Sequence, residues 1–171
     1  LLNNPVEVSS RLARFAHDSN IQAVMAVTLA KVDSTEEAKL EVLKAVAESN
    51  VRSLATGLGG CLKTTLEDKS PALVEQAVKT LNALADAKLG NEYRRGLLRV
   101  SSDESRAEGL RMEALATAGR IASKAKSDKV KLDEHLLQCV CAGLADDRPV
   151  RTRALAADVL TTAVLTTSQR S

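Results

Sequence analysis

The segment from Thr56 to Thr64 is the part of the chain closest to a phosphate-binding loop, because three glycines precede its Lys-Thr pair. Such a loop needs a glycine directly before that pair, so that backbone N–H groups can wrap the phosphates, and it follows a strand. Leu62 occupies the required glycine position, and no strand pattern precedes the segment. We therefore expect a break between two helices here and not a nucleotide site.

One histidine and two cysteines in the last third of the chain invite comparison with a zinc site. His135 and Cys139 are four residues apart and share a helix face, whereas Cys141 is rotated away and no fourth ligand lies nearby in sequence. Buried cysteines that act as small hydrophobic residues explain the pair better. Three cysteines without metal spacing fit reduced thiols in an intracellular compartment, and we expect the cytoplasm.

Side chains suited to catalysis are sparse. His17 and His135 are the only two histidines, and neither lies in a recognisable catalytic pattern. Carboxylates are numerous but scattered, as on ordinary polar helix faces. We therefore expect no enzyme activity, no bound metal and no cofactor.

The basic residues, which include the arginines, are distributed unevenly along the chain. Through residue 85 the chain has 9 basic and 10 acidic residues, whereas the remainder has 15 basic and 12 acidic residues. A face lined by arginines would suit phosphates or acidic peptides, so nucleic-acid binding is the alternative function. Interleaved acidic residues oppose it, and an aromatic content of 1% leaves few rings for base stacking. The possible basic patch comprises Arg94, Arg95, Arg99, Arg151 and Arg153.

These residues must be positioned by helices, since no segment alternates with period two over β-branched and aromatic residues. Ser34 and Glu37 have capping-box spacing, Ser70-Pro71 is typical of a helix start, and we place another start at 101–103. One apolar stripe comprises Ile21, Val24, Met25, Thr28, Leu29 and Val32. Further stripes predict helices near 38–46, 51–66 with a break at its glycines, 74–85, 93–100, 110–121, 136–144 and 150–164.

Length and composition indicate a folded protein. The chain has 171 residues, of which 44% are hydrophobic and 27% charged. No apolar run reaches the roughly 18 to 20 residues of a membrane span, so we expect no membrane insertion. The chain does not begin with Met, and we expect a fragment or a processed product of a larger protein.

Three of the predicted helices share a residue pattern. Each has an apolar anchor with a small or β-branched residue four positions later: Val74 with Val78, Leu110 with Ala114, and Val150 with Ala154. Asp68, Asp103 and Asp147 precede the anchors, and Arg111 and Arg151 follow two of them. The anchors are 36 and 40 residues apart. In this pattern the chain resembles HEAT-repeat and armadillo-like proteins, whose repeats of about 40–47 residues contain paired helices.

The resemblance implies an all-α fold, an α-solenoid of stacked antiparallel helix pairs, with a compact helical bundle as the structural alternative. It covers about residues 50–167 and departs from the repeat pattern at Glu75, which replaces the arginine after Val74. We expect a single repeat domain over 1–171. Its units fall near 1–33, 34–66, 67–100, 101–145 and 146–171.

A stack of this kind acts through its surface, so we expect a non-enzymatic scaffold or adaptor for protein partners in a multi-subunit assembly. The predicted partner contacts are Glu75, Lys79, Arg111 and Arg120. The resemblance also implies that Asp103 with Arg111, and Asp147 with Arg151, form structural hydrogen bonds. A large side chain at Ala114 or Ala154 should overpack the stack.

Overall fold

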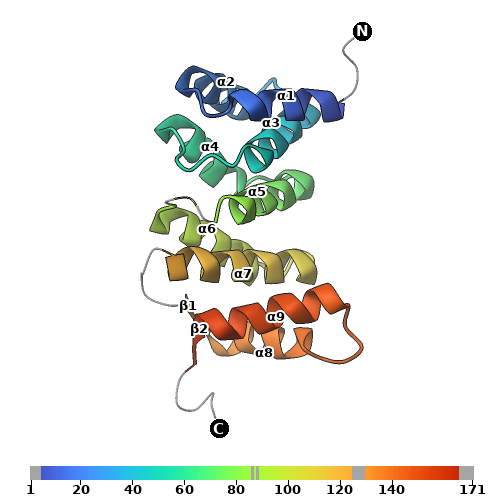
Figure 1. Ribbon diagram of the computed structural model, residues 1–171. Coiled ribbons are helices and arrows are strands. Elements are labelled where there is room, and N and C mark those ends of the chain that lie inside the picture. The colour runs from blue at the N-terminus through green and yellow to red at the C-terminus, as the bar shows by residue number, and fades with distance from the viewer. Residues whose placement is uncertain (1–4, 86, 88, 125–129, 166–171) are drawn as a thin grey trace. The chain divides into compact units, whose positions relative to one another are not determined.

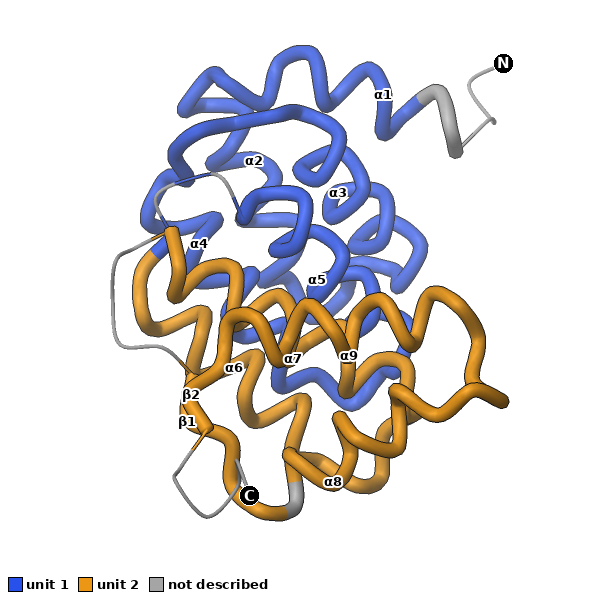
Figure 2. Tube along the Cα trace, turned by 60° about the horizontal axis from the view of Figure 1, so that its bottom comes forward, with its two compact units in different colours: residues 1–89 blue, residues 90–171 orange. Residues whose placement is uncertain are grey.

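The computed structural model describes residues 5–85, 87, 89–124 and 130–165. This part of the chain is helical apart from two short strands, which confirms the predicted all-α character (Figure 1). It divides into two compact units, residues 1–89 and residues 90–171, which are coloured separately in Figure 2. The first unit contains α1 (Pro5–Phe15), α2 (Ser19–Ala30), α3 (Glu36–Glu48), α4 (Thr56–Thr65) and α5 (Pro71–Ala83). The second contains α6 (Asn91–Ser102), α7 (Glu108–Lys124), β1 (Val130–Lys131), α8 (Glu134–Gly143), α9 (Val150–Thr162) and β2 (Ala163–Val164).

The helices of the first unit pack in two rows. α3 packs against both α1 and α5, and α2 packs against α4. Ser70 caps α5 by accepting a hydrogen bond from the Leu73 N–H, and Pro71 is the first helical residue, where its missing N–H is not needed. The predicted helix start at Ser70-Pro71 is therefore confirmed. The largest fully buried side chains of this unit include Met25, Leu43, Leu58, Leu62, Leu81 and Leu84.

Two polar side chains also join separate elements of the first unit. Buried Gln22 donates from Nε2 to the Ala16 carbonyl at 2.8 Å, and its Oε1 accepts from the Ala55 N–H at 2.6 Å. Thr80 of α5 is fully buried, and its hydroxyl lies 2.9 Å from the Leu43 carbonyl of α3. Backbone groups that water cannot reach are thereby hydrogen-bonded by side chains from other elements.

In the second unit α7 is the central helix. Both α6 and α9 pack against it, and its residues 112–119 are all buried. Small residues allow the close approach, because a Cβ added at Gly119 would lie 3.1 Å from Cβ of Thr162 in α9. The strands β1 and β2 pair in parallel, with Val130 opposite Ala163.

Two predictions for the helices of the first unit are wrong, one about where α3 starts and one about a break at the glycines of 57–60. α3 begins one residue later than the capping box predicts, because Thr35 and not Ser34 accepts the hydrogen bond from the Ala38 N–H. The glycines of 57–60 do not break a helix but lie inside α4, although glycine is unfavourable there by about 1 kcal/mol relative to Ala. Packing against α2 stabilises α4 despite this preference, and Leu58 and Leu62 of α4 are fully buried.

Three predictions in the second unit also need correction. The helix expected to start at 101–103 starts at Glu108, because α6 continues to Ser102 and Asp103 forms a turn with Ser105 and Arg106. The strand pair was not predicted, since two residues per strand are too few for an alternating pattern. Ala154 is exposed on α9, so a large side chain there has no core to overpack, whereas Ala114 is fully buried.

Candidate interaction surface

The glycine-containing segment does not form a phosphate-binding loop. Its residues belong to α4, where the Gly59 N–H donates to the Ala55 carbonyl and the Thr64 hydroxyl donates to the Gly60 carbonyl. Such a loop works because its N–H groups are free to point at an anion. The Gly59 N–H is committed to helical bonding, so the segment serves helix packing.

The three cysteine side chains lie in different environments. In the part of the chain that the structure describes, all three are free thiols and no three His, Cys, Asp or Glu side chains are grouped to hold a metal ion. The His135 side chain lies outside that description. Cys141 is exposed and Cys139 half-buried, so Cys141 is not the buried residue that the sequence predicts. Burial raises the pKa of the Cys61 thiol, whose sulfur donates to the Ala26 carbonyl at 3.3 Å.

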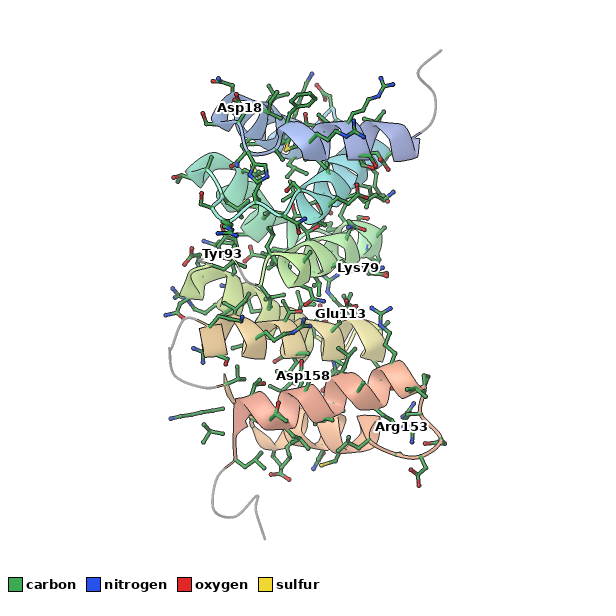
Figure 3. The ribbon with its side chains drawn as sticks, viewed as in Figure 1. Asp18, Lys79, Tyr93, Glu113, Arg153 and Asp158 are labelled. Carbon is green, nitrogen blue, oxygen red and sulfur yellow. The ribbon has the colours of Figure 1, made fainter. Side chains whose placement is uncertain are left out.

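Two of the predicted partner contacts, Glu75 and Lys79, lie on the first unit. Both belong to the solvent side of α5, where Lys79 Nζ lies 2.6 Å from Glu75 Oε1. Lys79 is labelled in Figure 3. Ion pairs four residues apart on an exposed helix face stabilise it by only about 0.3–0.5 kcal/mol. The pair is a solvated feature of α5 and leaves both side chains accessible.

The other two predicted contacts, Arg111 and Arg120, flank the buried stretch of α7 in the second unit. Arg111 Nε donates to the Ser101 carbonyl at 2.9 Å and so joins α7 to α6. Arg120 Nε lies 3.5 Å from Asp158 Oδ2 of α9. Both arginines therefore link helices within their unit, which leaves only part of each guanidinium for a partner.

Acidic partners face the arginines along the contact between α7 and α9. Buried Glu113 of α7 accepts from Arg151 Nη2 at 3.3 Å, and Arg148 Nη1 lies 3.3 Å from Glu108 Oε2. Figure 3 shows Glu113 on α7 and Asp158 on α9. Together with Arg120–Asp158, these pairs join residues 108, 113 and 120 of α7 to residues 148, 151 and 158, which lie just before and within α9, so α7 and α9 run parallel. The pairs neutralise most of the cationic charge along this contact.

The remaining predicted basic residues differ in their surroundings. Arg153 Nη1 lies 3.6 Å from Asp146 Oδ1, while Arg94 and Arg99 of α6 also have polar or electrostatic partners. Arg95 is exposed on α6. Arg151 and Arg153 thus have acidic partners at 3.3 and 3.6 Å, which compensate part of the charge of the predicted basic patch.

Asp103 makes bonds other than the one to Arg111 that the resemblance implies. Asp103 accepts from the Ser105 hydroxyl at 2.6 Å and from Arg106 Nε at 3.0 Å. These bonds, with the Ser105 hydroxyl first, lower the pKa of the Asp103 carboxyl. Arg151 pairs with Glu113 across to α7 and not with Asp147. The arginine is structural, as the resemblance implies, but its partner comes from another helix.

α9 presents an uncharged strip to solvent. Val150 is 73% exposed, and Ala154 and Ala157 are exposed on the same side of the helix. Arg151 and Asp158 lie beside this strip and are themselves engaged in the pairs with α7. An apolar centre with charged residues of both signs around it is the arrangement typical of protein-binding surfaces.

α2 carries the second exposed apolar surface. The apolar stripe predicted from Ile21 to Val32 is not a buried face, because Val24 and Val32 are 60% and 92% exposed. The buried residues of α2 are instead Gln22, Met25, Ala26 and Leu29. The signal that could have found this surface is the absence of any charged residue from Ser19 to Ala30, which makes periodicity a poor guide.

Comparison of the chain with protein-family models, with curated proteins and with solved structures gives no match. Among the described helices, none is both long and apolar enough to cross a membrane.

Proposed function

We propose that the chain is a non-enzymatic scaffold module that binds a helical segment of a partner protein along α9. The observation that supports this proposal is the exposed uncharged strip of Val150, Ala154 and Ala157. Alanines let a second helix approach closely, and residues at positions i, i+4 and i+7 match the spacing by which helices recognise one another. Val150 supplies the larger apolar group at one end of the strip.

The charges around the strip favour a protein over a nucleic acid. A nucleic-acid surface needs cations that can replace the counterions of phosphates. Arg120, Arg148 and Arg151 instead face the carboxylates of Asp158, Glu108 and Glu113. A partner helix that carries both acidic and basic residues can form ion pairs with these arginines and with these carboxylates. A phosphate backbone would have to displace the carboxylates from the arginines.

We also propose the finer architecture that the resemblance implies, an α-solenoid of stacked helix pairs serving a multi-subunit assembly in a reducing, cytoplasmic compartment. Its support is the packing inside each unit, where α3 lies between α1 and α5, and α7 packs beside a parallel α9. Small-angle scattering tests the architecture. An elongated particle agrees with a solenoid, whereas the radius of gyration of a compact bundle contradicts it.

The functional test is affinity enrichment from a native lysate, with and without nuclease, using the parent chain and two variants of the strip, Ala154→Glu and Ala157→Glu. We expect one or more proteins to be retained by the parent in stoichiometric amounts, to survive nuclease, and to be lost with both variants. A carboxylate in the centre of an apolar strip would have to be desolvated on binding, which is costly.

The matched control is Ala72→Glu, which places the same substitution on an exposed position of α5 in the other unit. It should retain the same proteins as the parent, and circular dichroism should show equal helix content in all variants. Recovery that disappears with nuclease would instead support the nucleic-acid alternative. Proteins retained equally by the parent, the strip variants and the control would place the binding surface away from α9 and contradict the proposal.

A further inference from the structure

The solvent face of α2 is unlike the exposed faces of the other long helices. Its twelve residues contain no charge, and Val24 and Val27 are 60% and 65% exposed. Phe15, one of two aromatic residues in the chain, is 63% exposed at the end of α1 directly before it. By contrast, α5 carries the Glu75–Lys79 pair on its solvent side. Exposed apolar surface concentrated in this way marks a contact site.

The two residues that directly flank α2, Asp18 and Lys31, have opposite charges, with Arg14 and Asp33 farther out in the sequence. Asp18 caps the start of α2, where its carboxylate accepts hydrogen bonds from the N–H groups of Asn20 and Ile21. Lys31 follows the last residue of the helix and is exposed. Each charge is also at the helix end that its sign favours, carboxylate at the N-terminus and ammonium at the C-terminus. Figure 3 shows Asp18 at the start of α2.

This arrangement is complementary to itself. If a second copy of α2 lies antiparallel against the first, Asp18 of each chain comes opposite Lys31 of the other, and Val24 lies near the two-fold axis. The helix dipoles then also oppose each other. A parallel pairing would place like charges together at both ends. We propose that the α2 face binds a second copy of this chain, in an antiparallel, two-fold symmetric contact.

The same charges disfavour a membrane as the occupant. Helices that lie on a lipid surface carry Lys and Arg along their polar face. α2 has no basic residue within its length, and its flanking Lys31 is balanced by Asp18. The contact area is limited to one short helix and Phe15, so the association should be weak and reversible. This inference concerns the first unit and is independent of the α9 surface.

The first test is sedimentation equilibrium of the intact chain over a range of concentrations. We expect a monomer–dimer equilibrium in which Val24→Lys and Val27→Lys each raise the dissociation constant at least about tenfold, since a buried ammonium has no partner in the pair. Leu144→Lys is the control, because Leu144 is a large apolar side chain that is 36% exposed in the other unit. A chain that remains monomeric throughout, or a control that weakens the dimer equally, overturns the proposal.

The second test distinguishes the two pairing directions. In a background with Cys61, Cys139 and Cys141 replaced by Ser, whose dimerisation is first shown to match the parent, single cysteines are introduced at Val24 or Asn20. Antiparallel pairing should cross-link Val24→Cys to its own copy but not Asn20→Cys, which lies away from the axis. Cross-linking of both positions would show parallel pairing, and cross-linking of neither would show that another surface is used. Either result overturns the proposal.

Discussion

Inside each of the two units, a different kind of polar contact joins the helices. In the first unit, side-chain amides and hydroxyls bridge separate elements, as Gln22 does to residues Ala16 and Ala55. The ion pairs Lys44–Glu41 and Lys79–Glu75 of that unit each lie within a single helix. In the second unit ion pairs join α7 to α9, as in Arg151–Glu113.

This difference means that the ion pairs of the second unit should respond to salt, whereas the neutral hydrogen bonds of the first unit should not. A buried neutral hydrogen bond is insensitive to salt and does not titrate near neutral pH. An ion pair with one exposed partner is screened by salt and contributes little on its own. We therefore expect the first unit to depend on a few irreplaceable polar groups, and the second unit to depend on apolar packing with charge as a modest addition.

The largest effect is expected from Gln22→Ala in the first unit. The substitution leaves the Ala16 carbonyl and the Ala55 N–H without the partner that now bonds them at 2.8 and 2.6 Å. Unsatisfied buried groups cost about 1–3 kcal/mol each, and the Ala55 N–H is only part-buried, so the free energy of unfolding should fall by about 2–4 kcal/mol. Urea unfolding followed by circular dichroism measures it, since the chain has no Trp and a single Tyr. Asn20→Ala, exposed on the same helix, should change it far less, and equal losses in both variants would refute the bridging role.

Overpacking α7 should give the next largest effect, now in the second unit. Ala114 is fully buried between neighbouring helices, so Ala114→Leu should lower the free energy of unfolding by about 1–3 kcal/mol. Ala154→Leu makes the same chemical change at an exposed position and should leave the unfolding midpoint nearly unchanged. Similar midpoints for the two variants would mean that packing around α7 is loose enough to accept a leucine.

Charge between α7 and α9 should contribute less. A double-mutant cycle with Glu113→Gln and Arg151→Gln should give a coupling of about 0.5 kcal/mol at low salt, because the Arg151 side chain is largely exposed. The coupling should vanish in about 1 M NaCl, where charges are screened beyond about 3 Å. The penalty of Gln22→Ala should be the same in both salts. A coupling that resists salt would show that the pair is shielded from solvent, and the contrast between the units would then be smaller.

The helices could be predicted from the sequence where local signals agree with tertiary contacts. Ser70 and Pro71 fix the start of α5 through backbone chemistry alone, and that start is confirmed. The position of α4 could not be predicted, because the helix forms despite its glycines by packing against α2, which comes from a distant part of the sequence. The role of Gln22 is equally non-local, since its bond to Ala55 spans 33 residues.

The candidate surface was predictable only in part. The resemblance pointed to the helices that share the repeat pattern. Arg111, Arg120 and Arg151 do lie on or beside the contact of α7 with its neighbours. The acidic partners of Arg120 and Arg151 come from other helices, so the partner that the resemblance implies for Arg151, Asp147, differs from the Glu113 that it contacts. On α2, apolar residues occur around the whole helix, and only the fold decides that Val24 faces solvent.

The smallest expected effect is a dependence of stability on pH, which should differ between a substitution in the second unit and one in the first. The Ser105 hydroxyl, then the Ser105 N–H and Arg106, lower the pKa of Asp103 below its unfolded value of about 3.9. A carboxyl with a lowered folded pKa stabilises the fold above the unfolded pKa, and this contribution is lost as pH falls through the folded pKa. The unfolding midpoints of the parent and Asp103→Asn should therefore differ slightly at pH 7 and converge below about pH 4. The difference produced by Gln22→Ala should remain constant over the same range, because no bond that it removes titrates there. If the Asp103→Asn difference also stays constant down to the acid limit of folding, the turn at Asp103 acts through neutral hydrogen bonding, as in the first unit.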